Sequence, residues 1–230
     1  MDYNEVAEDY EKFEDITEWE LGYKEVFKLL GDVNNKIILD YGAGNLKFSR
    51  FLRDRGAKCI AVEPSKKMLK IAEKYNNSGI KVHEIKNNDI SFLKSNSVDM
   101  IVINFVFCVI SNKDEIKQII KESYRILKKD GLLVILDPNP ESIGRDFLSF
   151  KSEKPKSQES GTAYRIKLKL NSGFVNLIDY YWPLEDYIEF LKKGGFKKMK
   201  ILEPMIDKDS CKKWLDEKIK PPYIIIRTQK

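Results

Sequence analysis

One stretch decides the fold: Ile37-Ile38-Leu39-Asp40-Tyr41-Gly42-Ala43-Gly44-Asn45-Leu46. Its first half is an apolar run typical of a buried strand, and its second half places an acid and two glycines where that strand turns into a helix. Glycines at the carboxyl end of a parallel strand let a ligand approach the backbone, and open α/β sheets bind their ligands there. The stretch therefore predicts a ligand site at the end of the first strand.

A second acid follows at the end of the next predicted strand, in the run Ala61-Val62-Glu63-Pro64. A carboxylate at this position can hold the two hydroxyl groups of a ribose. A nicotinamide dehydrogenase would also need a third glycine to complete its phosphate-binding loop, but Leu46 or Lys47 stands there. Without that glycine the loop is a poor receiver for a pyrophosphate. The two motifs therefore favour a ligand with a ribose and no phosphates.

Apolar runs alternate with amphipathic patterns between residues 36 and 137. Such alternation with short connections is typical of a parallel sheet with helices on both faces. The last helix of this block ends at Lys129-Asp130-Gly131, a stop signal that opens directly into a strand. We expect strands at 36–40, 58–62, 80–85, 98–105 and 132–137, and helices at 48–55, 66–75 and 113–128.

Further elements precede and follow this block. Aromatic and aliphatic residues among acids at 1–30 predict a helical cover over one edge of the sheet. Alternating residues on both sides of Asn171-Ser172-Gly173 predict a β-hairpin. We expect a mobile loop at 138–162 with a short helix at 143–150, the hairpin at 163–182, helices at 184–193 and 209–219, and strands at 196–202 and 223–228.

Four motifs occur in order along the central block. They are Leu39 to Gly44, then Val62-Glu63-Pro64-Ser65 with Met68-Leu69, then Asn88-Asp89-Ile90 ahead of Ser97 to Val102, and finally Arg125 to Ile135. Together they resemble the motifs of class I S-adenosylmethionine-dependent methyltransferases. The resemblance implies a single α/β domain over 1–230 with a doubly wound, mostly parallel, seven-stranded Rossmann-like sheet. Its parts are a helical cover (1–30), a cofactor-binding core (35–137), a substrate-side insertion with the hairpin (138–182), and a C-terminal helix and strand pair (183–230).

The same resemblance implies roles for individual residues around S-adenosylmethionine. Asp40 lies near the sulfonium and amino-acid end, Glu63 grips the ribose, and Asp89 with Ile90 flanks the adenine. Asn104 offers its backbone to the amino group of the ligand. Leu46 departs from the pattern, because many relatives carry a third glycine there. The predicted cofactor residues are Asp40, Gly42, Ala43, Gly44, Glu63, Pro64, Met68, Asp89, Ile90 and Asn104.

The acceptor side of the site is less specified by the sequence. In this fold an inserted hairpin commonly shapes the acceptor pocket, so we expect the run Asp179-Tyr180-Tyr181-Trp182 to form a wall of that pocket. The run would equally suit a hairpin face that packs on the core or on a second subunit. The predicted catalytic residues are Asp137, Tyr3, Tyr10 and Tyr181, and further acceptor-site candidates are Phe107, Asn139, Tyr164, Arg165, Tyr180 and Trp182.

We expect methyl transfer to a nitrogen, oxygen or sulfur of a small-molecule acceptor by in-line displacement, with no obligatory strong base. Methylation of a tRNA base is the alternative that the net charge of +5 and the basic stretch from Lys151 to Lys169 favour. A non-catalytic protein that keeps the ligand is a third possibility.

Composition narrows the class of protein further. The 33% of charged residues and the lack of an apolar run of membrane-spanning length argue against a membrane protein. The acidic start from Met1 to Glu5 lacks the features of a secretory signal, so a cytoplasmic location is expected. We expect a monomer or homodimer without a membrane partner. The single histidine, His83, rules out a metal site built on a histidine pair, so no metal is expected.

Overall fold

The structure, a computed structural model, describes residues 13, 15–171, 173–207 and 213–230. A seven-stranded sheet in the order β3-β2-β1-β4-β5-β10-β9 forms its centre. The first five of these strands are parallel, and β10 lies antiparallel between β5 and β9. The predicted doubly wound, mostly parallel sheet is confirmed. The strands are β1 (Ile37–Tyr41), β2 (Lys58–Glu63), β3 (Ile80–Glu84), β4 (Val98–Asn104), β5 (Leu127–Pro138), β9 (Lys198–Leu202) and β10 (Tyr223–Gln229).

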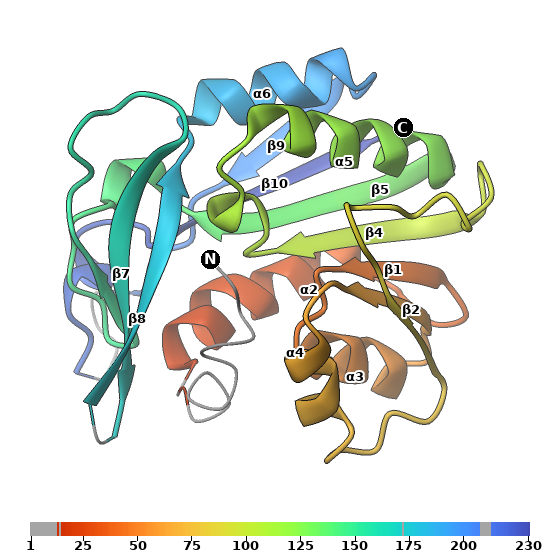
Figure 1. The fold of residues 1–230 in the computed structure, drawn as a ribbon, viewed down its shortest axis with the longest axis horizontal. Coiled ribbons are helices and arrows are strands. Elements are labelled where there is room, and N and C mark those ends of the chain that lie inside the picture. Colours follow the sequence, from red (N-terminus) through yellow and green to blue (C-terminus); the bar gives the residue numbers. More distant parts are fainter. Residues whose placement is uncertain (1–12, 14, 172, 208–212) are drawn as a thin grey trace.

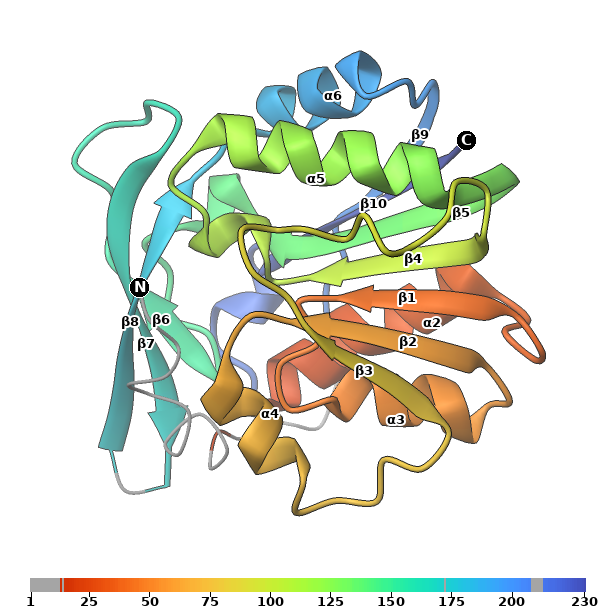
Figure 2. The same cartoon turned by 45° about the vertical axis from the view of Figure 1, so that its right-hand side comes forward.

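Helices cover both faces of the sheet (Figures 1 and 2). Successive strand residues point to opposite faces, so Ile38 packs in one apolar cluster and Leu39 in the other. The first cluster includes side chains of the helices near the amino end, and the second those of α5 and α6. The helices are the π-helical turn η1 (Glu18–Tyr23), α2 (Lys24–Leu30), α3 (Lys47–Asp54), α4 (Lys66–Ala72), α5 (Lys113–Ile126) and α6 (Leu184–Lys193).

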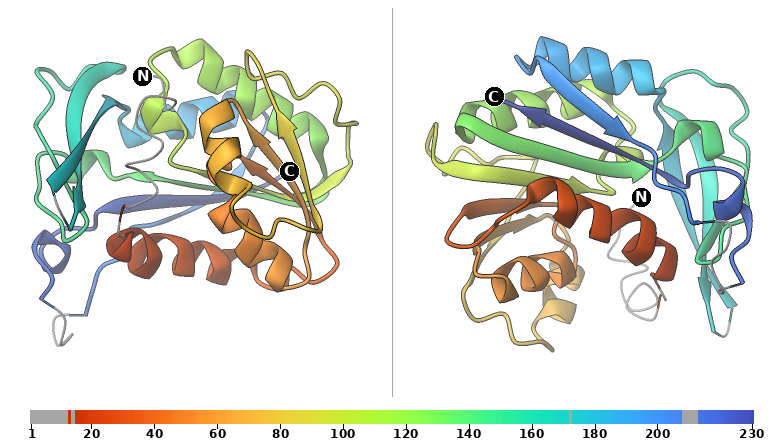
Figure 3. Two further views of the ribbon diagram at one scale, coloured as in Figure 1. Left: turned by 60° about the horizontal axis from the view of Figure 1, so that its bottom comes forward. Right: turned by 180° about the vertical axis from the view of Figure 1, so that it is seen from behind.

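Elements η1 and α2 form the described part of the N-terminal cover. They lie along β5 and β10 on the face that also carries α3 (Figure 3). Their buried residues Leu21, Val26 and Leu30 belong to the same apolar cluster as Tyr223 of β10. The first and last described segments of the chain are thereby held together.

Helix α5 ends earlier than the sequence predicts. Leu127 is fully buried and pairs with Val98 at the start of β4, so the chain leaves the helix at Ile126. The pairing then shifts register and resumes at Met100 and Leu132. The predicted stop signal lies within β5, where Asp130 has a φ of +63°. Burial of one leucine thus outweighs the local helical pattern.

The insertion forms a second, antiparallel sheet of three strands in the order β6-β7-β8. Strands β7 (Thr162–Leu170) and β8 (Gly173–Tyr181) are the predicted hairpin, and the short β6 (Phe150–Ser152) pairs with β7. This sheet stands across the carboxyl ends of the parallel strands (Figure 1). Its inner residues join the core cluster, so it forms a wall beside the ligand edge of the large sheet.

Two predicted helices are wrong within the described residues. At 143–150 the backbone N–H of Phe147 donates a 2.7 Å bond to the carbonyl of Phe150 in a tight turn. This turn buries both rings and leads into β6. Among the described residues nearby, only η3 (Pro140–Ser142) is helical. Of 209–219, residues 209–212 lie outside the described residues, and only η4 (Asp216–Lys218) is helical. The Glu217 carboxylate accepts bonds from the backbone of Leu148 and Leu215, which holds this segment as a turn.

Candidate active site

A pocket of about 550 Å³ opens at the carboxyl ends of β1, β2 and β4. Its volume lies within the range of small-molecule and cofactor sites. Eight of the predicted cofactor residues line it: Asp40, Gly42, Ala43, Gly44, Glu63, Pro64, Met68 and Asn104.

The loop after β1 depends on glycine where the backbone turns toward the pocket. Gly42 has φ +72°, and a Cβ atom there would stand 2.5 Å from Cγ2 of Val106. Leu46 takes φ +63° at the start of α3 although it is not glycine. It is fully buried against Ala61 and Ala72, and this packing offsets the cost of the left-handed conformation. The missing third glycine is therefore replaced by an anchored leucine.

Two acids lie at the base of this pocket. The Glu63 carboxylate accepts backbone bonds of 2.8 Å from both Gly44 and Ser65, which orients it toward the loop after β1. Asp40 accepts a 2.6 Å bond from the Ser49 hydroxyl. Burial, together with the nearby charge of Glu63, raises the pKa of Asp40 to about 7. Burial also raises the pKa of Glu63. Acids in such a place favour a ligand that brings hydroxyl groups and positive charge.

Asn104 stands at the end of β4 with both amide atoms of its side chain buried and without a hydrogen-bond partner among the described residues. The next residue, Phe105, has φ +56°, a conformation that is uncommon for a bulky side chain. Unpaired buried groups and backbone strain concentrate at functional sites. Asn104 is thus a polar group that a ligand in this pocket would satisfy.

The predicted adenine motif is only partly at the pocket. Asn88 lines it and accepts a 3.1 Å bond from the Tyr41 hydroxyl. Asp89 is exposed outside the lining, with its carboxylate bonded to the backbone of Ser91, and Ile90 is buried in the core. The side chain that the structure brings to the pocket is therefore the amide that precedes the predicted acid.

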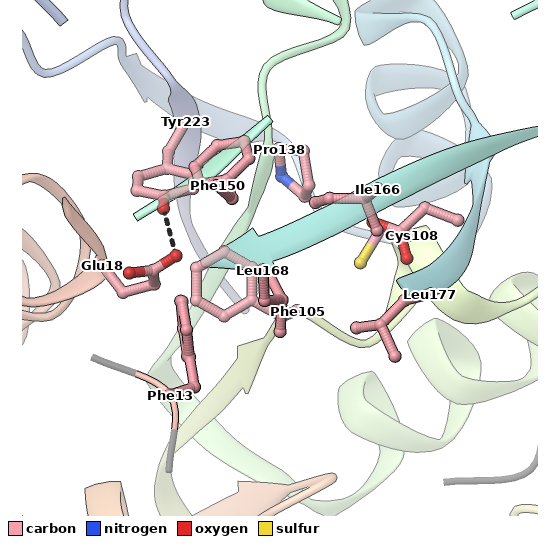
Figure 4. Close-up of a pocket in the computed structure, with 11 residues that line it drawn as sticks. Phe13, Glu18, Phe105, Cys108, Pro138, Phe150, Ile166, Leu168, Leu177 and Tyr223 are labelled. Atoms are coloured by element: carbon pink, nitrogen blue, oxygen red, sulfur yellow. Dashed lines mark hydrogen bonds between the residues drawn. The ribbon is translucent and has the colours of Figure 1, made fainter. Parts of the chain in front are cut away.

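A second, smaller cavity of about 40 Å³ lies between the large sheet and the insertion. Phe13, Glu18 and Phe105 line both this cavity and the larger pocket, so the two volumes adjoin. The rest of its lining is mostly apolar (Figure 4). It consists of Cys108, Pro138, Phe150, Ile166, Leu168, Leu177, Asp179 and Tyr223.

Glu18, from η1, is a buried acid at the boundary of the two volumes that sequence reasoning missed. Its Oε1 accepts a 2.8 Å bond from the Tyr223 hydroxyl (Figure 4), whereas its Oε2 is buried without a partner among the described residues. Burial raises the pKa of Glu18 to about 8. The Ser149 hydroxyl lies close enough to Glu18 to moderate this rise. The carboxyl therefore has one oxygen fixed by Tyr223 and a second, buried oxygen that no described residue holds with a hydrogen bond of good geometry.

Asp179, from β8, is the second acid in the small cavity. Burial and the nearby charge of Asp137 raise the pKa of Asp179 to about 8. Asp137 itself lines neither volume; it accepts a 3.3 Å bond from the Tyr187 hydroxyl, and burial raises its pKa to about 7. Of the predicted wall from Asp179 to Trp182, Asp179 is the member that faces the cavity.

The other acceptor-site candidates lie elsewhere. Tyr181 is buried but lines neither volume, and Trp182 packs in the core, where its ring N–H bonds to the carbonyl of Ile110. Tyr3 and Tyr10 lie outside the described residues. The same two volumes are not lined by Phe107, Asn139, Tyr164, Arg165 or Tyr180.

Comparison with known proteins agrees with this geometry. A family model described as a methyltransferase domain matches residues 39–135. The chain is 30% identical over 173 residues to an uncharacterized methyltransferase of Staphylococcus carnosus, covering 75% of this chain and 73% of that one. It is 27% identical over 207 residues to N-demethylindolmycin N-methyltransferase of Streptomyces griseus, covering 86% of this chain and 87% of that one.

Solved structures share the fold. An S-adenosylmethionine-dependent methyltransferase of Mesorhizobium loti superimposes with a TM-score of 0.68 at 15% identity, covering 93% of this chain and 98% of that one. An S-adenosylmethionine-dependent methyltransferase of Clostridium acetobutylicum superimposes with a TM-score of 0.64 at 16% identity, covering 99% of this chain and 98% of that one.

The fold and the pocket define a class I methyltransferase. The chain belongs to the S-adenosylmethionine-dependent methyltransferase family, and it is an enzyme of that type. No helix among the described residues is long and apolar enough to cross a membrane.

Proposed function

We propose that this methyltransferase acts on a small molecule, whose reacting end enters the cavity beneath the insertion. The observation that carries the proposal is that this cavity is lined mostly by apolar side chains and shares Phe13, Glu18 and Phe105 with the lining of the larger pocket. A volume of about 40 Å³ suits a few heavy atoms of an acceptor. The similarity to an enzyme named for N-demethylindolmycin supports the same reading.

The residues of the large pocket fit S-adenosylmethionine. Glu63 would hold the ribose hydroxyls, the loop from Gly42 to Gly44 would accommodate the methionine part, and Asp40 would face its positive charge. Asn104 would meet the amino-acid end and Asn88 the adenine side, with Asp89 and Ile90 behind it. When bound, the cofactor supplies a methyl group on a sulfonium, which needs no further activation.

The protein then contributes alignment and exclusion of water. Phe13 and Phe105 lie where the two volumes meet, so their rings would keep water from the transfer path. The wall formed by Ile166, Leu168 and Leu177 would hold the apolar part of the acceptor. Asp137 would act on the acceptor only indirectly, through Asp179.

Two of the six basic side chains in the stretch that favoured tRNA as an acceptor lie beside acids. Lys169 pairs with Asp146 at 2.5 Å, and Lys167 lies 3.9 Å from Glu153. Binding of RNA without a concentrated basic face would be weak at physiological salt. A small acceptor is therefore the better reading.

A substitution that fills the cavity tests this proposal. Leu177→Trp is expected to abolish methyl transfer to small molecules while calorimetric binding of S-adenosylhomocysteine is retained. Asn176→Trp, one residue away on the outer face of the hairpin, is the control and should keep transfer. Methyl transfer is followed by mass spectrometry with trideuteromethyl-labelled cofactor against a metabolite extract and against bulk tRNA. Label found only in tRNA would refute the proposal.

A further inference from the structure

The small cavity contains two buried carboxyl groups and no positive side chain. Glu18 and Asp179 both line it, and no lysine, arginine or histidine stands among its described lining residues. Burying a carboxylate without a cation costs several kcal/mol. Both acids are less than a tenth exposed, so water does not relieve this cost. In the empty cavity each acid avoids this cost by keeping its proton, and a positive group that enters would stabilise the ionised form instead.

Glu18 is the carboxyl that faces the transfer path. The hydrogen bond from Tyr223 fixes Oε1, which leaves Oε2 as the oxygen without a partner among the described residues. Because Glu18 lines both the cofactor pocket and the small cavity, an acceptor atom bonded to Oε2 would lie at the boundary between them. An acceptor atom must lie there to receive a methyl group.

We propose that the acceptor is a primary or secondary amine and that Glu18 binds its ammonium nitrogen and takes a proton from it. This inference rests on the proposed function, since it names the chemical class of the small acceptor. Asp179 completes the negative lining of the cavity and favours the cationic form on entry. An alcohol or a thiol brings no positive charge that would stabilise the ionised form of these acids.

The step balances without any further reagent. The proton passes from the ammonium nitrogen to Oε2 of Glu18 and frees the nitrogen lone pair. That lone pair forms the new N–C bond to the methyl carbon while the C–S bond breaks, and the electron pair of that bond remains on sulfur. The product is an N-methylammonium ion with S-adenosylhomocysteine, and Glu18 releases its proton to solvent as the product leaves.

Burial suits Glu18 for this task. With a pKa of about 8, Glu18 is closer in basicity to an alkylamine than an ordinary glutamate is. Proton transfer from the ammonium group to Glu18 is therefore less unfavourable. The hydrogen bond from Tyr223 moderates this rise, because it favours the charged form.

Matched amines and alcohols test the acceptor class. Benzylamine, phenethylamine and tryptamine are compared with benzyl alcohol, phenethyl alcohol and tryptophol, in calorimetric binding to the enzyme loaded with S-adenosylhomocysteine and in transfer from labelled cofactor. We expect binding and N-methylation of amines and neither for the alcohols. Methylation of an alcohol, or of no amine by enzyme that binds S-adenosylhomocysteine, would overturn the inference.

The variant Glu18→Gln tests the role of the carboxyl, with Glu20→Gln as a control on the same helical turn that lines neither volume. Glu18→Gln should lower kcat/KM for the amine about 10²- to 10⁴-fold near neutral pH, with a smaller deficit at high pH, where the free amine is already neutral. Calorimetry in buffers of different ionisation heat measures the number of protons exchanged when the amine binds. This proton exchange should be lost in Glu18→Gln.

The outcomes separate the two claims. Failure to bind S-adenosylhomocysteine, or transfer to tRNA alone, would defeat the proposed function. Transfer to small amines with an unchanged pH profile in Glu18→Gln would defeat only the inference about Glu18.

Discussion

The hydroxyl of Tyr223, on the last strand, donates a 2.8 Å hydrogen bond to the carboxyl of Glu18, on the first helical turn. The two residues are 205 positions apart, and both are buried. This bond joins the N-terminal cover to strand β10 and lowers the pKa of Glu18 relative to burial alone. It therefore connects the stability of the cover with the chemistry proposed for the acceptor.

Removing this hydroxyl should change the pH dependence of transfer. In Tyr223→Phe the pKa of Glu18 rises above about 8, because a bond that favours the charged form is lost. We expect the rise of kcat/KM with pH to move to higher pH, with a loss of about tenfold near neutral pH. Tyr124→Phe, on α5, is the control and should keep the wild-type profile. A Tyr223→Phe profile identical to wild type would argue against a titrating Glu18.

Substitution of one glycine should weaken cofactor binding specifically. Gly42→Ala combines a strained φ of +72° with a Cβ atom 2.5 Å from Val106, at the wall of the large pocket. Gly31→Ala also places a side chain at a positive φ, +69°, but no atom lies within 4 Å of its Cβ position. Both variants should lose about 1 kcal/mol of stability from the backbone. Only Gly42→Ala should lower S-adenosylhomocysteine affinity, by about tenfold or more; equal affinities would show that the contact with Val106 is unimportant.

The free enzyme should be less stable in alkaline than in mildly acidic solution. Glu18, Asp40, Asp137 and Asp179 have pKa values raised to about 7 or 8, so the folded chain binds more protons than the unfolded chain from about pH 4 to about pH 8. The free energy of unfolding therefore falls as pH rises through this window. Urea unfolding at several pH values measures the slope.

A variant identifies the source of that slope. Asp179→Asn should make the free energy of unfolding fall less steeply with pH, because it removes one of the buried acids whose pKa is raised. The exposed Asp114, whose pKa is lowered by Lys117, is the control, and Asp114→Asn should leave the slope intact. A wild-type protein whose stability rises from about pH 5 to about pH 8 would contradict the burial of these acids.

The pocket proposed for the cofactor could be predicted from the sequence because its signals are local. Asp40, Gly42 and Glu63 stand directly after buried apolar strands, and parallel strands bring their carboxyl ends to one edge. The central strands β1 and β4 were recognisable because their residues are buried on both faces and form continuous apolar runs. Even so, the side chain brought to the pocket after β3 is Asn88, not Asp89.

The cavity proposed for the acceptor could not be predicted in this way, because tertiary contacts create it. Glu18 stands in an acid-rich amphipathic segment, where a carboxylate is usually exposed, and only the packing of η1 against β10 buries it. Asp179 was noticed only as part of an aromatic run. Strand β6 exists because three residues from Phe150 pair with β7, which no local periodicity indicates. Long-range pairing thus decides what the insertion presents to the site.

Calorimetric titration with S-adenosylhomocysteine tests the central claim most directly, that the pocket at the ends of β1, β2 and β4 holds this cofactor. The wild-type enzyme should bind S-adenosylhomocysteine and should not bind NAD. Glu63→Ala should bind S-adenosylhomocysteine about 100-fold more weakly, because it loses the charged hydrogen bonds of the carboxylate. Glu84→Ala, which removes the exposed acid opposite Glu63 in β3, should bind as wild type does. Absence of binding in wild type, or equal affinities for wild type and Glu63→Ala, would contradict the account.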